Sequence, residues 1–440
     1  MATFLHLSDV HLGFNRYNNG ERTKDFFYAF QDCIDRYAVQ QPVDFVLIVG
    51  DLFEHRSIQP STLNQAQIVL EHLKEAQIPV LAIEGNHDNC PYGVKTSWLR
   101  YLAEQEWLIL LEPEEDSDTL LSPWDPDSGR GGYIDLECGV RVVGSRWYGA
   151  STPQAIQKLA QALQTLPEPP DGTVMMLHHG LEGQIARYAG ALRYEDVLPL
   201  REAGVTYLAL GHIHKNYSEQ GWIFNAGSVE ANSVAEGQGH MRRGVYRVEL
   251  TAAGVKAELK QDYQQRPIYR LILEADKGWS QVDLENQALA LIERENWQQK
   301  LHGAIVELRL QGQVGFDRLD LNLRDLNDRL KTLSQALIFL LKSELAGSTY
   351  LEPLSPDQQL SREAIEISVF KDFLAGHHIY QHHLEHFAQG LSHLKQKLLE
   401  GESPDPLYSY VTELRLTDPK LTDSKLTDSK LTDLTLKTSD

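Results

Sequence analysis

Short apolar runs alternate with longer amphipathic stretches through the N-terminal half of the chain. The stretches over residues 22–37 and 61–77 repeat apolar side chains at the helical period. The apolar runs have the length of buried strands, and we predict strands over residues 3–8, 44–49, 78–83, 140–143, 174–177 and 207–210. Strands and helices in this alternation predict a layered α/β sheet.

A second alternating pattern begins after Arg266-Pro267, where the composition changes. Strands are predicted over residues 268–274, 304–311 and 336–343, with helices over 280–297 and 319–333 between them. This order of strand, helix, strand, helix and strand predicts a small second α/β domain.

The C-terminal part shows two further patterns. Residues 362–399 carry apolar side chains along one helical face, including Phe370, Phe373 and Leu374, which either bind a partner or pack on the second domain. A five-residue repeat begins at Leu416 with the letters LTDPK and continues with two copies of LTDSK, and its period suits neither a helix nor a heptad. We therefore predict a first domain over 1–262, a second over 263–350, a helical segment over 351–412 and a disordered tail over 413–440.

Five polar blocks follow apolar runs. They are Asp9-Val10-His11, Gly50-Asp51, Gly85-Asn86-His87-Asp88, His178-His179 and Gly211-His212-Ile213-His214. Ligands of layered α/β sheets bind beyond the carboxyl ends of the strands, where all five blocks fall. Carboxylate, amide and imidazole groups in this number suit two divalent ions. Each block alone is an ordinary turn or strand end, but the ordered series argues against coincidence.

The spacing within the blocks suggests separate roles. Asp9 and His11 are two residues apart, so on an extended strand end both side chains would share one face and could hold one ion. Asp51 can place one oxygen on each of two ions.

The third block divides its roles in the same way. Asn86 offers a neutral carbonyl oxygen, while His87 beside it is better placed to face a substrate as a proton donor. Asp88 could orient His87 by accepting its ring N–H. In the last two blocks we favour His178 over His179 as a ligand, and His212 and His214 again share a face.

At these residues the chain resembles the calcineurin-like metallophosphoesterases, whose pattern is D-x-H, G-D, G-N-H-D, H and G-H-x-H. Residues 8–13, 50–53 and 83–88 are similar to the SbcD subunit of the SbcCD DNA-repair nuclease. The second α/β unit corresponds in chain order to the cap domain of those nucleases, and the helical segment to the place where they bind their ATPase partner.

The resemblance implies a layered metallophosphoesterase sandwich with a small α/β cap domain and a C-terminal helical segment. It also implies a two-metal phosphodiesterase, usually dependent on Mn²⁺, that acts on DNA ends. By matching position, the first ion is held by Asp9, His11, Asp51 and His214, the second by Asp51, Asn86, His178 and His212, and His87 is the catalytic histidine. The implied partners are DNA and an SbcC-like ATPase, with a homodimer inside a heterotetramer.

The chain departs from these nucleases after Gly50-Asp51-Leu52-Phe53. They commonly carry a histidine at the next position, whereas this chain has Glu54 and then His55, which could still point inward. Further candidates for DNA contact are Arg16, Tyr17 and Arg22, through phosphate pairing and base stacking. A histidine cluster follows near the C-terminus, at positions 377, 378, 382, 383 and 386, and we expect a structural or solvent-facing role for it.

Charge and cysteine content narrow the function. The formal net charge of −21 argues against passive nucleic-acid binding through a global positive field, although two bound cations would supply local positive charge. Three scattered cysteines form no disulfide framework, and neither a secretory signal nor an apolar run long enough for a membrane is present, so we expect a cytoplasmic protein. Two rival functions stay open: a phosphoesterase acting on a small molecule or phosphoprotein, and a weakly active scaffold that tethers DNA ends.

Overall fold

The computed structural model describes residues 1–114, 119–167, 171–184, 190–237, 241–346, 362–375, 380 and 383–416. By its internal contacts the chain divides into two compact units. The first consists of Met1–Leu273, Ala288–Arg309 and Asn327–Lys342, and the second of Glu274–Gln287, Leu310–Leu326 and Ser343–Asp440. All five polar blocks lie in the first unit.

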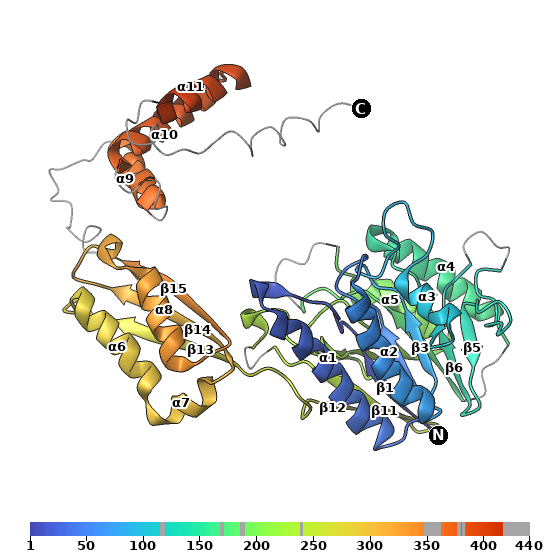
Figure 1. Cartoon of the computed structure of the whole chain (residues 1–440). Coiled ribbons are helices and arrows are strands. Elements are labelled where there is room, and N and C mark those ends of the chain that lie inside the picture. The colour runs from blue at the N-terminus through green and yellow to red at the C-terminus, as the bar shows by residue number, and fades with distance from the viewer. Residues whose placement is uncertain are drawn as a thin grey trace. The chain divides into compact units, whose positions relative to one another are not determined.

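The first unit contains two six-stranded sheets (Figure 1). In the first sheet the strand order is β12 (Gly254–Lys260), β11 (Val245–Thr251), β1 (Ala2–Leu7), β2 (Phe45–Val49), β3 (Val80–Ile83) and β4 (Ile109–Leu110). Strands β1 to β4 pair in parallel, while β11 and β12 pair antiparallel. The parallel strands therefore end at one edge, where three of the polar blocks begin.

In the second sheet the strand order is β5 (Tyr133–Asp135), β6 (Val140–Val143), β7 (Gly172–Leu177), β8 (Val205–Leu210), β10 (Ile223–Asn225) and β9 (Tyr217–Glu219). Strands β6, β7 and β8 pair in parallel. The remaining two polar blocks follow β7 and β8.

The two sheets pack face to face between two layers of helices. Between the sheets, the Phe4 ring stacks on Phe45 at 4.7 Å and meets Tyr207 edge-on at 5.1 Å. The outer face of the first sheet packs on α1 (Gly20–Ile34) and α2 (Pro60–Glu75), and that of the second on α4 (Thr152–Thr165) and α5 (Tyr194–Glu202). A short helix, α3 (Trp98–Glu104), precedes β4. The predicted layered α/β class is confirmed, and both faces of each sheet are buried, which explains the continuous apolar runs.

One histidine belongs to the core between the sheets. His6 of β1 is fully buried, with Nδ1 2.8 Å from the Tyr207 hydroxyl and Nε2 3.0 Å from the Leu210 carbonyl. Nε2 must donate to the carbonyl, and in the neutral ring Nδ1 accepts from the Tyr207 hydroxyl. Burial lowers the pKa of His6 to about 4.

We therefore expect acid to destabilise the fold through His6. The pKa is about 4 in the folded chain and about 6.5 when unfolded, so protons bind preferentially to the unfolded chain between these values. Lowering the pH from 7.5 to 5 should reduce the free energy of unfolding by about 2 kcal/mol through this one group. Urea unfolding of the wild type and of His6→Gln at both pH values measures this loss. The loss should be smaller in His6→Gln by about 2 kcal/mol. An equal loss in the wild type and the variant would contradict the expectation.

The predicted second α/β pattern forms a three-stranded sheet. Its order is β13 (Ile268–Ala275), β14 (Ile305–Gln313) and β15 (Ile338–Ala346). Helices α6 (Gln281–Glu293) and α7 (Glu295–Leu301) come between the first two strands, and α8 (Leu323–Ser334) precedes the last. The predicted order of elements is confirmed, while the domain boundaries at 262/263 and 350/351 stay predictions.

Three helices follow, namely α9 (Arg362–Ala375), α10 (Leu384–Leu399) and α11 (Pro404–Leu416). Leu374 and Phe387 are buried where α9 and α10 pack, with Phe370 partly covered, whereas Phe373 is 69% exposed. The predicted apolar face thus packs largely on itself. Helix α11 extends to Leu416, past the predicted start of the tail at residue 413, and the repeat beyond it lies outside the described residues.

Two further observations concern the helices and the cysteines. Within the described part of the chain, no helix is both long and apolar enough to cross a bilayer. Cys33, Cys90 and Cys138 are all free thiols.

Candidate dinuclear metal centre

The five polar blocks converge beyond the carboxyl ends of β1, β2, β3, β7 and β8. Backbone hydrogen bonds tie the first two blocks together, since Asp9 N donates to Gly50 O at 3.1 Å and His11 N donates to Asp51 O at 3.0 Å. Gly85 lies against Asp51, and a Cβ on that glycine would come within 2.1 Å of Asp51 Oδ1. The glycines of the blocks therefore allow the loops to approach closely.

Several residues of the polar blocks have a left-handed backbone conformation, which is unusual for residues other than glycine. The φ angles of Asp9, His11, Asp51 and His212 are +53°, +52°, +54° and +78°. Left-handed backbone at residues other than glycine costs about 1–3 kcal/mol each and persists where the surrounding structure imposes it. The prediction that Asp9 and His11 share a face on an extended strand end is wrong, because β1 ends at Leu7 and both residues adopt left-handed backbone. Their side chains nevertheless meet, with His11 Nε2 3.9 Å from Asp9 Oδ1.

A first cluster is formed by Asp9, His11 and His214, whose ligand atoms all lie within 4.8 Å of one another. The two histidines face each other with Nε2 atoms 3.2 Å apart, and His214 Nε2 is 3.8 Å from Asp9 Oδ1. Asp9 is fully buried and accepts the backbone N–H of His212. This cluster contains three of the four residues expected around the first ion.

A second cluster is formed by Asp51, His178 and His212. His178 Nε2 lies 3.1 Å from Asp51 Oδ2, and His212 Nδ1 lies 2.9 Å from Asn86 Oδ1. All four residues expected around the second ion therefore meet. The role of Asp51 as a bridge between the two clusters stays a prediction.

The orientation of the rings fits a bound cation. His178 Nδ1 donates to Val49 O at 2.8 Å, while its buried Nε2 faces the Asp51 carboxylate at 3.1 Å. The Nδ1 atoms of His11 and His214 both face glutamates, so their Nε2 lone pairs point at each other. Lone pairs converging on carboxylates are what a divalent cation such as Mn²⁺, Fe²⁺ or Zn²⁺ requires.

Charge interactions inside the site are strong. Burial alone would raise the pKa of Asp51, but His178 outweighs it and the pKa is lowered, so the carboxylate stays ionised at neutral pH. Burial would lower the pKa of His178, yet Asp51 raises it to about 9. Burial and the neighbouring His178 together lower the pKa of His212 to about 4. His212 is therefore neutral at physiological pH without a cation, whereas a cation bound here would have to displace the extra proton of His178.

The two neighbouring histidines at the end of β7 differ in placement. His178 joins the second cluster, whereas His179 is stacked on the Trp147 ring at 5.6 Å. The centroid of the Trp147 ring also lies 5.0 Å from that of His212. The sequence did not indicate that this tryptophan contacts the second cluster.

His87 is held at the edge of both clusters. Its Nδ1 lies 2.6 Å from Glu54 O and must donate to that carbonyl, which leaves Nε2 for a substrate. Its backbone N–H donates to Asp51 Oδ1 at 2.9 Å. Together with His11 and Glu54 it forms a third close group, which shares His11 with the first cluster.

Asp88 does not orient His87, contrary to expectation. Its carboxylate accepts the backbone N–H groups of Gly85 at 3.0 Å, Phe53 at 3.1 Å and Leu52 at 3.3 Å. Both oxygens of the Asp88 carboxylate are engaged by these backbone N–H groups. The ring of His87 donates to the Glu54 carbonyl instead. Asp88 is therefore a buried clamp between two ligand-bearing loops rather than a catalytic group.

Asp88→Asn should destabilise the chain. Asparagine keeps one acceptor oxygen but turns an NH₂ donor towards backbone donors, so we expect the free energy of unfolding to fall by about 1–3 kcal/mol. Asp127→Asn, at an exposed position, provides a matched control in the same urea unfolding measurement. Equal stability of the two variants would contradict the clamp.

The residue after Gly50-Asp51-Leu52-Phe53 also differs from expectation. His55 is exposed and does not turn inward; Glu54 does, with Oε2 2.7 Å from His11 Nδ1. A second glutamate, Glu236, accepts a hydrogen bond from His214 Nδ1 at 3.3 Å. No motif contains Glu236, so the sequence offered no signal for it.

The candidates for DNA contact separate into two kinds. Arg22 is only 1% exposed, pairs with Asp25 at 2.6 Å and donates to the Ala231 carbonyl, so the prediction that it meets phosphates is wrong. Its place on the inner face of α1 explains the burial. Arg16 is exposed and lies 5.4 Å from the half-buried Tyr17 ring, and contact of this pair with DNA stays a prediction.

The C-terminal histidine cluster is described only in part. His377, His378 and His382 lie outside the described residues. His386 Nε2 lies 3.3 Å from Leu414 O, a contact between α10 and α11 that agrees with a structural role.

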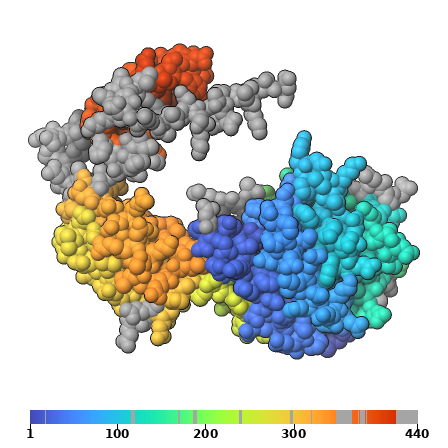
Figure 2. Space-filling view, in the orientation of Figure 1, coloured from blue at the N-terminus to red at the C-terminus, as the bar shows by residue number. Residues whose placement is uncertain are grey.

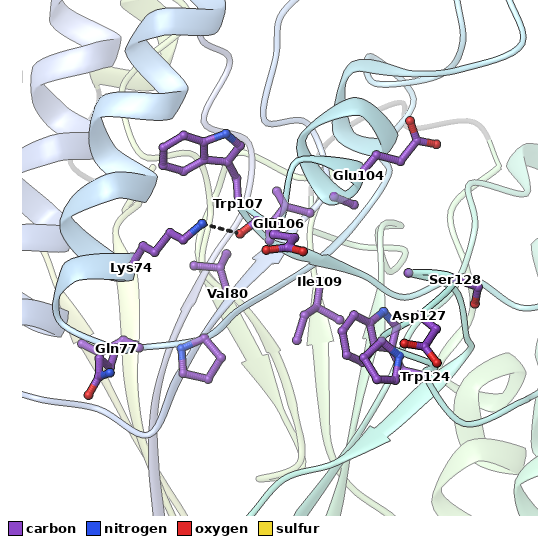
Figure 3. Close-up of a pocket in the computed structure, with 16 residues that line it drawn as sticks. Lys74, Gln77, Val80, Glu104, Glu106, Trp107, Ile109, Trp124, Asp127 and Ser128 are labelled. Carbon is purple, nitrogen blue, oxygen red and sulfur yellow. Dashed lines mark hydrogen bonds between the residues drawn. The ribbon is translucent and has the colours of Figure 1, made fainter.

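A pocket of about 670 Å³ lies elsewhere in the first unit (Figure 3). It is lined by the ends of α2 and α3 and by the first residues of β3 and β4, including Val80 and Ile109. Figure 3 shows the Lys74 ammonium donating to the Glu106 carbonyl beside Trp107. This pocket is at the amino ends of the strands, whereas the clusters follow the carboxyl ends, so it does not contain the candidate site.

Comparison with known proteins agrees with this geometry. Residues 2–216, which contain all the ligand candidates, match the calcineurin-like phosphoesterase family.

Three archaeal relatives share the description "DNA double-strand break repair protein Mre11". The protein of Saccharolobus solfataricus is 29% identical over 259 residues, covering 57% of this chain and 61% of the relative. That of Archaeoglobus fulgidus is 33% identical over 256 residues (56% and 54%), and that of Sulfurisphaera tokodaii 31% over 217 residues (48% and 48%). The chain thus matches about half the length of these relatives.

Proposed function

Because residues 2–216 form a calcineurin-like phosphoesterase domain, we propose that the chain is a two-metal phosphodiesterase that cleaves DNA during double-strand-break repair. The observation that carries this proposal is the convergence of the two clusters with His87 at their edge. The relatives described as repair proteins support DNA as the substrate.

In this proposal Asp9, His11, Asp51 and His214 hold one ion, and Asp51, Asn86, His178 and His212 hold the other. Two divalent ions, proposed to be Mn²⁺, would neutralise phosphate charge and make water a better nucleophile.

The side chains of the protein do the rest. Glu54 O fixes the tautomer of His87, so that Nε2, when protonated, can give its proton to the oxygen that leaves phosphorus. Trp147 shields the second cluster from solvent on one side. Arg16 and Tyr17 supply a cation and an aromatic face for the DNA strand.

The partners follow from the same proposal. The C-terminal helices, orange to red in Figure 2, expose Phe373, Leu398, Leu399 and Tyr408 at 69%, 59%, 76% and 73%. An exposed apolar surface of this kind suits a protein partner. We place the contact with an SbcC-like ATPase there, in a heterotetramer built on a homodimer and acting in the cytoplasm.

Substrate choice tests the proposal. The full chain with Mn²⁺ is incubated with end-labelled linear duplex DNA, with mononucleotides and with bis-p-nitrophenyl phosphate, and each reaction is repeated with EDTA. We expect metal-dependent cleavage of DNA and of the model diester. Hydrolysis of mononucleotides without DNA cleavage would favour a small-molecule phosphoesterase. A chain that binds DNA but hydrolyses none of the substrates would favour a tethering scaffold.

A further inference from the structure

Two glutamates outside the proposed ligand set contact histidines of the first cluster. Glu54 Oε2 lies 2.7 Å from His11 Nδ1, and Glu236 Oε1 accepts from His214 Nδ1 at 3.3 Å. Both glutamate side chains are mostly buried, with exposed fractions of 16% and 15%. Both histidines of this cluster are therefore backed by a carboxylate on the nitrogen that faces away from the site.

The two carboxylates are held in place. Glu54 Oε2 and His11 Nδ1 are both buried and lie 2.7 Å apart in an ion-pair contact, and neither atom has a hydrogen-bond partner among the described residues. Glu236 is fixed through its second oxygen, which accepts the backbone N–H of Asn232 at 2.8 Å.

The second cluster is built differently. His178 Nδ1 donates to the Val49 carbonyl at 2.8 Å, and His212 Nδ1 lies on the Asn86 amide oxygen at 2.9 Å. In both rings the group beside Nδ1 is neutral. Asp51 is the one carboxylate within this cluster of described side chains.

We propose that Glu54 and Glu236 are positioning residues that make the first cluster the tighter of the two cation sites, so that the sites fill in order. This inference rests on the proposed function, because it requires that both clusters bind cations. A carboxylate on Nδ1 fixes the tautomer that presents the Nε2 lone pair and increases the basicity of the ring. Each glutamate also adds negative charge to the side of the site that already contains Asp9.

Glu54 links this effect to the position at which the chain departs from the nucleases that it resembles. They commonly carry a histidine there, which brings no negative charge. In this chain the carboxylate of Glu54 backs His11, while its backbone carbonyl accepts from His87 Nδ1. Side chain and backbone of one residue thus serve a ligand and the proton donor separately, and Glu54→Gln alters only the first.

Metal titration tests the inference without a measurement of activity. Mn²⁺ is added to the metal-depleted full chain, and binding is followed by calorimetry and by the electron paramagnetic resonance of unbound Mn²⁺. We expect two binding steps of unequal affinity in the wild type. Glu54→Gln and Glu236→Gln should each weaken the tighter step about tenfold to a hundredfold and leave the weaker step unchanged. Glu71→Gln, an exposed glutamate of α2, is the matched control for loss of one charge.

The possible outcomes separate the two proposals. Two binding steps that do not respond to either glutamate variant, or that both weaken equally, overturn the inference and leave the proposed function standing. A third Mn²⁺ equivalent that disappears in Glu54→Gln also overturns it, because Glu54 would then be a ligand itself. A wild type that binds no Mn²⁺ overturns the proposed function. If Glu54→Gln does not fold, as judged by circular dichroism, Glu236→Gln decides the question alone.

Discussion

Asp51→Asn should abolish metal-dependent cleavage of linear duplex DNA, with a loss of about a thousandfold or more. Asp51 is the buried carboxylate of the second cluster, 3.1 Å from His178 Nε2, and in the proposed assignment it also holds the first ion. Asparagine retains the shape of the side chain but removes its charge. Several kcal/mol of charge stabilisation depend on the ion pair, and each 1.4 kcal/mol corresponds to about tenfold in rate.

The measurement is a single-turnover rate at saturating Mn²⁺, with the Mn²⁺ content of each protein determined in parallel. Asp127→Asn, an exposed aspartate, is the matched control and should cleave as the wild type does. The Mn²⁺ content of Asp51→Asn should be lower than that of the wild type, because the second cluster loses its carboxylate. Full cleavage by Asp51→Asn would exclude the second cluster from the chemistry.

The sequence predicted the strands and the polar loops that follow them because both depend on local patterns, whereas the grouping of residues around two ions came from the family resemblance. A strand buried on both faces needs an uninterrupted apolar run, as in residues 45–49, and a ligand loop must begin where that run ends. Asp9, Asp51 and His178 could therefore be located before their neighbours in space were known.

The parts that could not be predicted depend on contacts between distant segments. Glu236 reaches His214 from a short 3-10 helix that carries no motif. Arg22 follows the first polar block and reads as a surface cation, but it pairs with Asp25 and Glu230 inside the protein. Arg22 is buried because α1 packs against the segment around Ala231, and this contact cannot be predicted from the sequence.

The conformations of the ligand loops were also beyond the sequence. Asp9 and His11 suggest an extended strand end by spacing, yet both have positive φ. A residue other than glycine adopts that conformation only when surrounding contacts impose it, here the hydrogen bonds to the loop after β2. Which residues converge was therefore predictable, whereas the backbone conformation that brings them together was not.

His87→Ala should reduce DNA cleavage by about 100- to 10,000-fold, the usual contribution of a positioned proton donor. The ring lies beside both clusters, with Nδ1 engaged by Glu54 O and Nε2 left for the leaving oxygen. It is not a member of the two clusters expected to hold the ions. Mn²⁺ binding should therefore be retained, in contrast to Asp51→Asn.

The leaving group distinguishes proton donation from a general electrostatic role. A sugar alkoxide leaves phosphorus readily only when it receives a proton, whereas p-nitrophenolate leaves without one. His87→Ala should therefore slow DNA cleavage severely but slow hydrolysis of bis-p-nitrophenyl phosphate by less than about tenfold. His87 could instead stabilise negative charge on the phosphoryl oxygens. That charge is present during cleavage of both substrates, so both rates would then fall by the same factor. Equal losses on the two substrates would therefore remove the proton-donor role from His87 while leaving it in the site.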